Sequence, residues 1–382
     1  MHAATTSKEC EPETMTDSTL PLSRLKIWVL VPYLETEDPN LQYYYDFSQS
    51  LKEYTQVFKQ LNAHWHWQPV TLQNFKEVIA SIKERSAGLT PLVLNLCDGD
   101  EINSTPGISV IHELEKHQLI YTGASAYFYD ITTSKIPMKQ AFDAHGVANA
   151  AWTVLNGNEK EIEGVCEKLG APLIIKPAIS GGSMGVSVKN VVHTDDELLA
   201  RIKELNEGYR GWQLTTGGLF AEQFISGPEF TTFIVGSYLQ PDECIVYPPV
   251  ERIFHASLPE TEKFLSFDRL WEIYEQETPM PGNGNFYEYH QPDSALVKDL
   301  QAISLQAYIA VKGTGYGRLD IRMDSKTGKL YMLEVNAQCG LSDDEDYTSI
   351  GAILRYAGKS FASLILEIVT DAWQRHSLKT VQ

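Results

Sequence analysis

Residues 172–190 read PLIIKPAISGGSMGVSVKN, and this stretch guides the interpretation of the whole chain. It begins as an apolar run that carries one lysine, Lys176, and continues into a loop of small residues with three glycines. An alternating run, Val186-Ser-Val-Lys189, then follows. The pattern predicts strands over 172–177 and 185–190 on either side of a glycine-rich loop.

The residue types in this loop favour a phosphate ligand. The loop differs from a P-loop, because it lacks the Lys-Ser or Lys-Thr pair and leads into a predicted strand. Its backbone N–H groups can nevertheless bind phosphate oxygens, and a loop with few side chains can open and close as a flap. Lys176 would supply a fixed positive charge to those phosphates. The alternative is a glycine-rich hairpin with a solvated lysine.

A second polar pattern lies near the carboxyl end of the chain. Arg318-Leu-Asp320 and Glu334-Val-Asn336 each place two polar side chains at i and i+2, which is one face of a strand. Two carboxylates and an amide on adjacent strands suit magnesium, which prefers oxygen ligands together with nucleotide phosphates. The arginine beside them suits stabilisation of a developing negative charge. The alternative is a salt-bridged sheet face.

Composition limits the class of protein. At 382 residues the chain predicts two or three domains, and its net charge of −19 argues against nucleic acid or an anionic membrane as the main partner. Five scattered cysteines without a CxxC pair favour a reducing compartment, so we expect a cytoplasmic protein. Residues 1–20 are polar and predict a disordered tail. No apolar run is long enough to span a bilayer.

Hydrophobic periodicity divides the chain into further elements. Apolar runs alternate with helical patterns in the first third, which predicts an α/β unit with a parallel sheet. Its expected strands are 26–32, 66–70 and 92–96, with helices near 47–61, 73–86 and 107–117. Later helices are expected at 137–146, 195–206 with a cap at Thr194, 294–311 and 349–373, and strands at 220–224, 230–235, 244–250, 317–324 and 330–336. Residues 252–292 predict a long loop with little regular structure.

Taken in order, these motifs resemble those of the ATP-grasp superfamily. KPAISGGSMGVS resembles its flexible glycine loop, EQFISGPEFT its adenosine-binding hinge, and GRLDIRMD with YMLEVNAQCG its metal-binding strands. The Tyr121-Thr-Gly-Ala124 turn and Lys135 add similarity to the D-alanine–D-alanine ligase-like branch, over roughly residues 90–375. The resemblance implies an α/β and α+β protein of three domains, with ATP held between two sheets. Its expected parts are 21–130 (N-terminal α/β domain), 131–221 (central ATP-grasp subdomain) and 222–376 (C-terminal subdomain with the metal site).

The resemblance also implies roles for individual residues. Lys176 and Arg318 would be catalytic, the latter by stabilising a tetrahedral intermediate. ATP would be bound by Lys135, Lys176, Ser180, Gly181, Gly182, Ser183, Met184, Glu222, Gln223, Phe224, Ile225 and Glu229, with Glu222 at the adenine and Glu229 at the ribose. Two Mg²⁺ ions, for which Mn²⁺ could substitute, would be held by Asp320, Glu334 and Asn336. Glu35, Asp98, Gly340 and Ser342 are candidates for binding the substrates.

The implied reaction is ligation of a small-molecule carboxylate, through an acyl phosphate, to an amine that is expected to be an amino acid. Two other functions remain open. These are an ATP-grasp kinase that phosphorylates a small molecule, and a nucleotide-binding protein without catalysis. Neither nucleic acid nor a membrane is an expected partner, and a homodimer is one arrangement that the resemblance allows.

The segments that bind substrates in dipeptide-forming relatives differ in this chain, at 31–39, 96–103 and 339–346. The last of these contains the run Asp343-Asp-Glu-Asp346, and like charges make it unsuited to a substrate carboxylate. Either the acceptor carries positive charge, or Ser342 and backbone amides hold its carboxylate while the acidic side chains face solvent. In both cases we expect substrates other than D-alanine.

Overall fold

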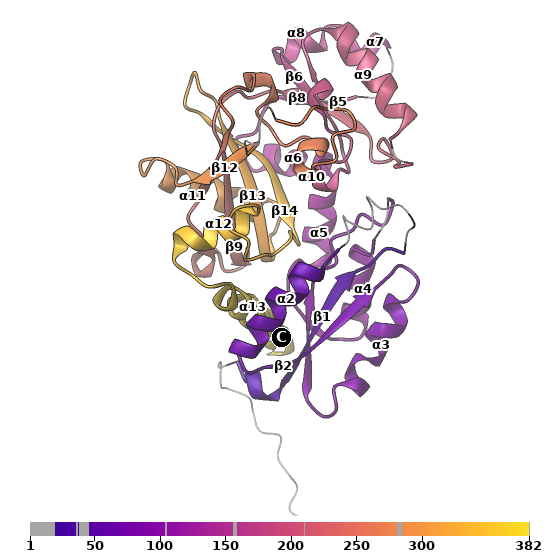
Figure 1. The fold of residues 1–382 in the computed structure, drawn as a ribbon, viewed down its shortest axis with the longest axis vertical. Helices are drawn as coiled ribbons and strands as arrows, with labels where there is room; N and C mark the ends of the chain where they lie inside the picture. Colours follow the sequence, from indigo (N-terminus) through magenta and orange to yellow (C-terminus); the bar gives the residue numbers. More distant parts are fainter. Residues whose placement is uncertain are drawn as a thin grey trace, which may run out of the picture.

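The structure, a computed structural model, describes residues 20–35, 37, 46–103, 105–155, 159–209, 211–280 and 285–381. This part of the chain forms three sheets, named here the parallel sheet, the small antiparallel sheet and the large antiparallel sheet. In the view of Figure 1 the large antiparallel sheet lies between the other two. The tail predicted over 1–20 lies outside the described residues, except for Leu20. Short 3-10 turns occur at η1 (Leu22–Arg24), η2 (Gly181–Ser183), η3 (Val188–Asn190), η4 (Pro241–Glu243) and η5 (Glu260–Glu262).

The parallel sheet has the strand order β2-β1-β3-β4, and its three strand pairs are parallel, which confirms the predicted α/β unit. Its central strand reads LKIWVLVP and is buried along nearly its whole length, as expected for a strand covered on both faces. The strands are β1 (Leu25–Pro32), β2 (His64–Val70), β3 (Thr90–Asn95) and β4 (Ile120–Tyr121), and the helices α2 (Ser48–Gln60), α3 (Phe75–Arg85) and α4 (Ile108–Lys116).

The small antiparallel sheet has the order β5-β8-β6-β7. Two helices, α5 (Ala126–Thr133) and α6 (Lys135–Ala144), connect the parallel sheet to it. Its strands are β5 (Trp152–Leu155), β6 (Leu173–Pro177), β7 (Val191–Val192) and β8 (Leu219–Gln223), and its helices α7 (Glu159–Ile162), α8 (Val165–Leu169) and α9 (Asp195–Glu207). Thr194 caps α9 as predicted, because its side chain accepts a hydrogen bond from the backbone N–H of Glu197.

The prediction of a strand over 185–190 is wrong. This segment forms the turn η3, and only the short strand β7 pairs with β6. Asn190 explains the difference, because its buried side-chain amide donates to the carbonyl of Ile175 at 2.7 Å and to that of Gly185 at 2.9 Å. A side chain that bonds to the backbone in this way replaces part of a strand ladder.

The large antiparallel sheet has the order β12-β11-β9-β13-β14, with β10 beside β9. The strand predicted at 244–250 is divided into two strands, and the loop prediction for 252–292 is wrong, because that segment contains most of one strand, a helix and another strand. The strands are β9 (Glu229–Ser237), β10 (Ile245–Val246), β11 (Val250–Phe254), β12 (Tyr287–His290), β13 (Thr314–Met323) and β14 (Leu330–Ala337). The helices are α10 (Phe267–Trp271), α11 (Val297–Ala310), α12 (Ser349–Ala357) and α13 (Phe361–Val381).

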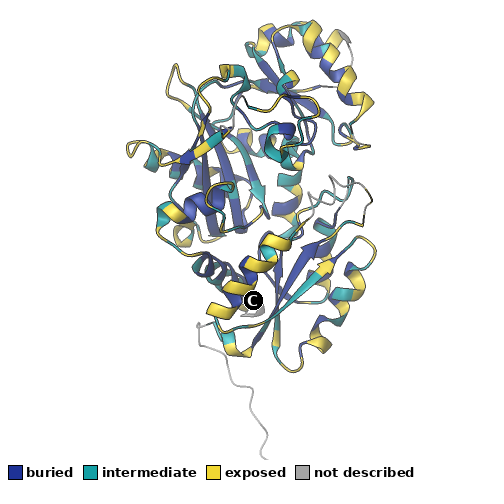
Figure 2. Cartoon of the chain, in the orientation of Figure 1, coloured by how far each residue is buried: buried dark blue, intermediate teal, exposed yellow. Residues whose placement is uncertain are grey.

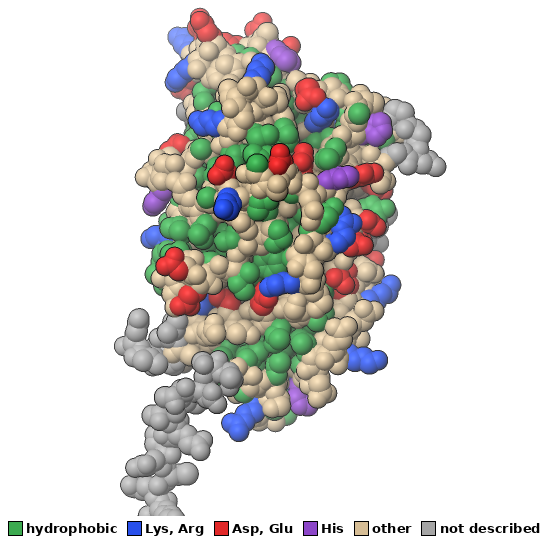
Figure 3. Space-filling view, turned by 90° about the vertical axis from the view of Figure 1, so that its left-hand side faces the viewer, with side chains coloured by type: hydrophobic (Ala, Val, Ile, Leu, Met, Phe, Trp, Pro, Cys, Tyr) green, Lys and Arg blue, Asp and Glu red, His purple; other side chains and the backbone are tan. Residues whose placement is uncertain are grey.

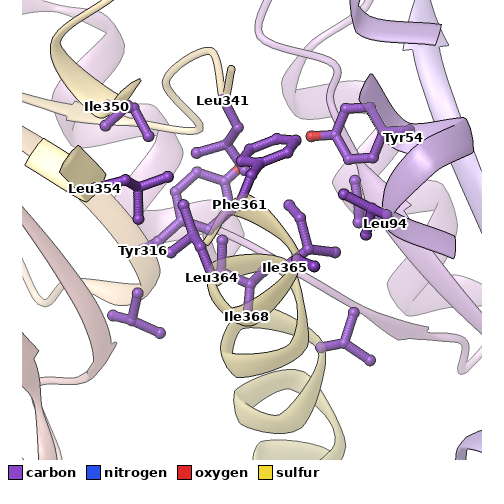
Figure 4. Close-up of a cluster of buried hydrophobic side chains, with 14 of the residues drawn as sticks. Tyr54, Leu94, Tyr316, Leu341, Ile350, Leu354, Phe361, Leu364, Ile365 and Ile368 are labelled. Carbon is purple, nitrogen blue, oxygen red and sulfur yellow. The ribbon is translucent and has the colours of Figure 1, made fainter. Parts of the chain in front are cut away.

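The predicted final helix over 349–373 is two helices. Gly358 follows α12 with a left-handed φ of +62°, the conformation typical of a helix C-terminus. The chain then turns into α13, which packs between the parallel sheet and the large antiparallel sheet. Figure 4 shows Leu364 and Ile365 of α13 between Leu94 on one side and Tyr316 on the other. The two sheets therefore share one apolar core.

Burial follows the sheets. The strands are mostly buried, while the outward faces of the helices are exposed (Figure 2). The face shown in Figure 3 carries acidic and basic side chains scattered among apolar and neutral ones. The charged groups that form a dense cluster lie instead between the two antiparallel sheets, in the cavity described below.

A close backbone contact fixes the parallel sheet against the large antiparallel sheet. Gly315 of β13 has a φ of +74°, and a Cβ atom there would lie 2.1 Å from the carbonyl oxygen of Gly123. The side chain of Gln338 completes the contact, because its Oε1 accepts from the N–H of Ala124 at 2.9 Å and its amide donates to the carbonyl of Asn95. Only glycine allows the two backbones to approach this closely.

We expect Gly315→Ala to lower the free energy of unfolding by about 3 kcal/mol, because a left-handed alanine and an overpacked contact each cost about 1–2 kcal/mol or more. Gly328→Ala is the matched control. Gly328 also has a left-handed φ, +70°, but no heavy atom lies within 4 Å of the added Cβ. Chemical denaturation of both variants measures the difference. Equal stability of the two variants would contradict the close contact.

Candidate active site

The candidate site is a cavity of about 560 Å³ that lies between the two antiparallel sheets and reaches the end of β3. It brings together nearly all of the residues selected from the sequence. Those that line it are Asp98, Lys135, Lys176, Ser180, Gly181, Gly182, Ser183, Glu222, Gln223, Phe224, Ile225, Glu229, Arg318, Asp320, Glu334, Asn336, Gly340 and Ser342.

Two of the selected residues do not line the cavity. Glu35 is exposed to solvent after β1 and lies outside the cavity wall. Met184 is buried and packs into the apolar cluster of the small antiparallel sheet, while its carbonyl accepts a hydrogen bond from Ser180 at 2.6 Å. Met184 therefore anchors the glycine loop to the apolar core of the small antiparallel sheet.

The polar residues of β13 and β14 meet on one face, as the i and i+2 spacing predicts. In the strand register Arg318 pairs with Asn336 and Asp320 pairs with Glu334. The Asn336 amide nitrogen lies 3.1 Å from Asp320 Oδ2 and 3.1 Å from Glu334 Oε1, and Arg318 lies 3.1 Å from Asp320. Thr231 of β9 donates to the other oxygen of Asp320 at 2.8 Å.

The acidity of the two carboxyls differs. Burial raises the pKa of Asp320 above its usual range, and the neighbouring Glu334 adds to the effect, although Arg318 opposes it. Burial would also raise the pKa of Glu334, but the positive charges of Lys135, Lys176 and Arg318 hold it at about 2. The site therefore keeps Glu334 ionised and disfavours a second negative charge beside it.

The donor set fits a hard divalent cation that also contacts phosphate. Among the described residues no group of three His, Cys, Asp or Glu side chains gathers to hold a metal ion by itself. The carboxylates of Asp320 and Glu334 and the amide of Asn336 offer only part of a coordination shell. Magnesium is commonly bound in this way, with one or two carboxylates and with nucleotide phosphates as further ligands.

Three lysines of α6 and β6 form ion pairs with carboxylates of the site. Lys135, at the start of α6, lies 3.2 Å from Glu334 Oε2 and donates to the carbonyl of Ser180 at 3.1 Å. Lys176 of β6 lies 2.7 Å from Glu222 Oε1, and Lys139 lies 2.5 Å from Glu222 Oε2. Lys135 of α6 thus contacts Glu334 of the large antiparallel sheet, while Lys176 and Lys139 are paired with Glu222 of the small one.

Lys139 and Glu222 form a buried ion pair, each about 1% exposed. Burial would raise the pKa of Glu222, yet Lys139 and Lys176 hold it at about 2. The side chain of Glu222 thus binds two lysines. Sequence reasoning missed Lys139, although its spacing of four residues from Lys135 places both lysines on one face of a helix.

Glu229 lies between two arginines that sequence reasoning also missed. Its carboxylate forms ion pairs with Arg252 of β11 and Arg322 of β13, and all three side chains are buried. Arg322 also donates to the carbonyls of Ile225 at 3.3 Å and of Lys263 at 2.7 Å. The spacing of Arg322 from Asp320 was a usable signal, since residues at i and i+2 share a strand face.

Part of the cavity wall is apolar. Ile174, Val186, Phe224 and Phe264 form a small buried cluster, in which the two phenylalanine rings lie 5.9 Å apart at 70°. The hinge residues 223–225 border this cluster and line the cavity. Such an apolar surface suits a flat heterocycle such as adenine.

The glycine loop is held by the segment around α10. The indole N–H of Trp271 donates to the carbonyl of Gly182 at 2.9 Å, and Ser183 donates to the carbonyl of Leu265 at 3.0 Å. Both segments line the cavity, so the glycine loop and the α10 segment form adjoining parts of its wall. Such a wall limits the access of water to reacting groups.

The other end of the cavity is bordered by the loop after β14. Gly340 and Ser342 line the cavity, but none of the residues 343–346 does. Asp344 is bonded within the loop, where its carboxylate accepts from the N–H groups of Asp346 and Tyr347, both at 3.1 Å. The arrangement supports the alternative in which the acidic side chains face solvent.

Sequence comparison identifies the family. The family model described as D-ala D-ala ligase C-terminus matches residues 141–370, which is more than half of the 382-residue chain. This chain belongs to the D-alanine–D-alanine ligase family. It is 28% identical over 261 residues to D-alanine–D-alanine ligase B of Pseudomonas syringae pv. tomato, with 68% of this chain and 70% of the relative covered. It is 27% identical over 266 residues to the ligase of Nitrosococcus oceani, with 69% and 72% covered.

Solved structures of ligases in this family share the fold. The D-alanine–D-alanine ligase of Bacillus anthracis, complexed with ATP, matches with a TM-score of 0.63 at 19% identity and covers 93% of this chain and 99% of its own. The ligase of Coxiella burnetii matches with a TM-score of 0.61 at 16% identity, covering 93% and 97%. The ATP-grasp fold predicted from the motifs is confirmed. Within the described residues, no helix has the length and apolar character needed to cross a membrane.

Proposed function

We propose that this chain is an ATP-dependent ligase that joins a carboxylate to an amine through an acyl phosphate. One observation carries the proposal. Lys135 of α6 and Lys176 of β6 line the same cavity as Asp320 and Glu334 of the large antiparallel sheet, and Lys135 lies 3.2 Å from Glu334. A bound triphosphate needs positive charge around its oxygens, which the lysines supply. The divalent ions that accompany it need carboxylate ligands, which Asp320 and Glu334 supply. Membership of the family supports the same reading.

The cavity residues support the following roles. Lys135, Lys176 and the N–H groups of loop 180–183 would bind the phosphates, and the hinge 223–225 would bind adenine. Glu229 would meet the ribose while remaining held by its two arginines. Asp320, Glu334 and Asn336 would hold two Mg²⁺ ions, or Mn²⁺ in their place. Bound ions would supply positive charge between the phosphates and the substrate.

The chemistry proceeds in two balanced steps. A carboxylate oxygen of the donor attacks the γ-phosphorus, the bond to the bridging oxygen breaks, and ADP leaves. The amine nitrogen then attacks the acyl carbon and loses a proton, and the carbon–oxygen bond to phosphate breaks. Lys135 and Lys176 neutralise the phosphates in the first step. Arg318 stabilises the oxyanion of the second, because preorganised donors act most strongly where negative charge develops.

Two other functions are less well supported. A small-molecule kinase would need only the first step, and it would not explain the half-buried arginine Arg318 beside the proposed metal ligands. A nucleotide-binding protein without catalysis would not need to retain Arg318, Asp320, Glu334 and Asn336 together on one strand face.

The test is a screen of amino acids, singly and in pairs, for ADP release with ATP and Mg²⁺, followed by mass spectrometry of the products. An amide formed in equal amount to ADP is the expected result. A phosphate ester would indicate the kinase, and no product would indicate a binding protein. Efficient ADP release with D-alanine alone would contradict our expectation that the substrates differ from D-alanine.

The setting is also a proposal. The four described cysteines, Cys97, Cys166, Cys244 and Cys339, are free thiols, which supports a reducing compartment and so the cytoplasm. A homodimer is proposed for the assembly, and light scattering of the purified chain would test it.

A further inference from the structure

Two buried arginines meet a single carboxylate on the cavity face of the large antiparallel sheet. Strand pairing places Arg252 of β11 and Arg322 of β13 on either side of Glu229 in β9, and we name these three residues the arginine row. All three line the cavity, and the two arginines are only 6% and 4% exposed. Two positive charges meet one negative charge here, so the arginine row carries a net positive charge inside the cavity.

Arg322 directs its terminal nitrogens to the protein. One of them donates to the carbonyl of Ile225 in the hinge at 3.3 Å. The other donates to Glu229 and to the carbonyl of Lys263 at 2.7 Å. The guanidinium also lies 5.4 Å from the centre of the Phe224 ring. Arg322 thus ties the hinge to the segment that contains Lys263.

Arg252 makes fewer hydrogen bonds to the protein. A guanidinium has five N–H groups, and in Arg252 one bonds to Glu229 and one to the hydroxyl of Tyr289 at 3.1 Å. No described residue accepts a hydrogen bond from the Nε of either arginine. The guanidinium of Arg252 lies 5.2 Å from the ring centre of Tyr287 and 5.4 Å from that of Tyr289. These rings hold the side chain in place, while N–H groups remain for a ligand.

The arginine row lies between the hinge and the proposed metal ligands. Asp320 precedes Arg322 by two residues on β13, and both line the cavity, so the two side chains follow each other on one face about 7 Å apart. On the other side of the row is the hinge, where Arg322 bonds to Ile225. A nucleotide whose base meets the hinge and whose phosphates meet the metal ions must therefore pass over the arginine row.

The charge of Arg252 also acts on the proposed metal site. Burial raises the pKa of the Asp320 carboxyl, and the positive charges of Arg318 and Arg252 oppose the rise. Arg252 is therefore close enough to influence an anion that binds beside Asp320. Such an anion would gain from the charge without having to displace a protein partner from the unused N–H groups.

From this arrangement we propose that Arg252 binds the phosphate chain of ATP, as a cation from the large antiparallel sheet in addition to Lys135 and Lys176. The inference rests on the proposed ligase function and adds a residue to its nucleotide site. Arginine suits the role, because its planar N–H groups can bind two phosphate oxygens at once. The phosphate chain in turn supplies the negative charge that the arginine row lacks.

Calorimetric titration with adenosine, AMP, ADP and ATP, in the presence of Mg²⁺, tests the assignment. Arg252→Met keeps an apolar stem of similar length but removes the charge and the donors. The variant should bind adenosine as the parent does and ATP about 30-fold or more weakly, as expected when one partner of a desolvated charged pair is removed. Arg252→Lys should recover part of the loss, because lysine keeps the charge without the planar fork. It carries the same comparison if Arg252→Met fails to fold.

Arg322→Met is the matched comparison. It removes the other arginine of the row and also leaves Glu229 with one partner. Because Arg322 bonds to the hinge carbonyl of Ile225, its loss should weaken adenosine and ATP by similar factors. Melting temperatures of the parent and both variants report any general folding defect. A loss that requires phosphate in Arg252→Met, but not in Arg322→Met, identifies the phosphate contact.

An Arg252→Met variant that binds ATP as tightly as the parent would overturn the inference. Equal losses for adenosine and ATP would also overturn it, because they would indicate a structural role. Unchanged ATP affinity with a raised KM for the carboxylate donor would assign Arg252 to that substrate instead, with the same consequence. These outcomes leave the ligase assignment intact. A parent protein that binds adenosine and ATP equally well would instead contradict the phosphate site itself, and with it the proposed function.

Discussion

Asp320→Asn should reduce turnover by about 1,000-fold or more without lowering the melting temperature. The loss follows because Asp320 faces Glu334 in the strand register and would hold the divalent ions that neutralise the phosphates. Removing a single preorganised electrostatic contact from a reacting centre commonly costs a factor of 100 to 1,000. Loss of a metal ligand affects every phosphate contact at once.

The same variant, Asp320→Asn, should be at least as stable as the parent protein. Burial raises the pKa of Asp320, so the fold disfavours its charged form, and Glu334 beside it adds repulsion. A neutral asparagine keeps the acceptor for the Thr231 hydroxyl and removes that cost. ADP release and thermal unfolding are the two measurements. Asp324→Asn is the control, because Asp324 lies in the turn after β13, accepts from the N–H groups of Lys326 and Thr327, and does not line the cavity. Turnover above one tenth of the parent would contradict the metal site.

Glu222→Gln should destabilise the protein more than any other change at the site, by about 3–5 kcal/mol. Glu222 is the partner of Lys139, which is only 1% exposed. Breaking a buried ion pair by removing one partner leaves an uncompensated charge, and that is the costly case. Lys176 loses the same partner, so its side chain should be held less firmly at the phosphate site. The KM for ATP should therefore rise.

The double variant Lys139→Met with Glu222→Gln distinguishes the cost of an unpaired buried charge from the cost of altered packing. Removing both charges should restore part of the stability lost in Glu222→Gln, since a buried pair replaced by neutral groups is often close to neutral overall. Denaturation of the single and double variants gives the coupling. Because the lysines hold the pKa of Glu222 at about 2, below its ordinary value of 4.5, the carboxylate contributes stability above pH 4.5 that is lost as pH falls towards 2. A single variant as stable as the parent would be inconsistent with a buried pair.

The site could be predicted from the sequence wherever local spacing determines which way side chains point. Asp320 and Glu334 were recognisable because i and i+2 residues share a strand face, and the pairing of β13 with β14 needed only a short turn. Lys176 was recognisable from its place between a buried run and a glycine loop. These patterns depend on neighbours in the chain, which a sequence displays directly.

Features that depend on distant contacts were missed. The alternation at 186–189 resembles a strand, but Asn190 bonds to the backbone of Ile175 and turns the segment into a 3-10 helix. The helix α10 within 252–292 forms against the glycine loop through Trp271. Lys139 gains its role only from Glu222, which lies on another element. Glu35, an acidic residue after the first strand that was a substrate-binding candidate, does not line the cavity.

The most direct test of the account follows the oxygen atoms of the donor. With both carboxylate oxygens of the donor replaced by ¹⁸O, formation of an acyl phosphate transfers one labelled oxygen to the phosphate that is released. Mass spectrometry of that phosphate should find one ¹⁸O atom for each ADP and each amide formed. Phosphate without label, released in step with ADP, would mean that water attacks the nucleotide, and would contradict ligation through an acyl phosphate.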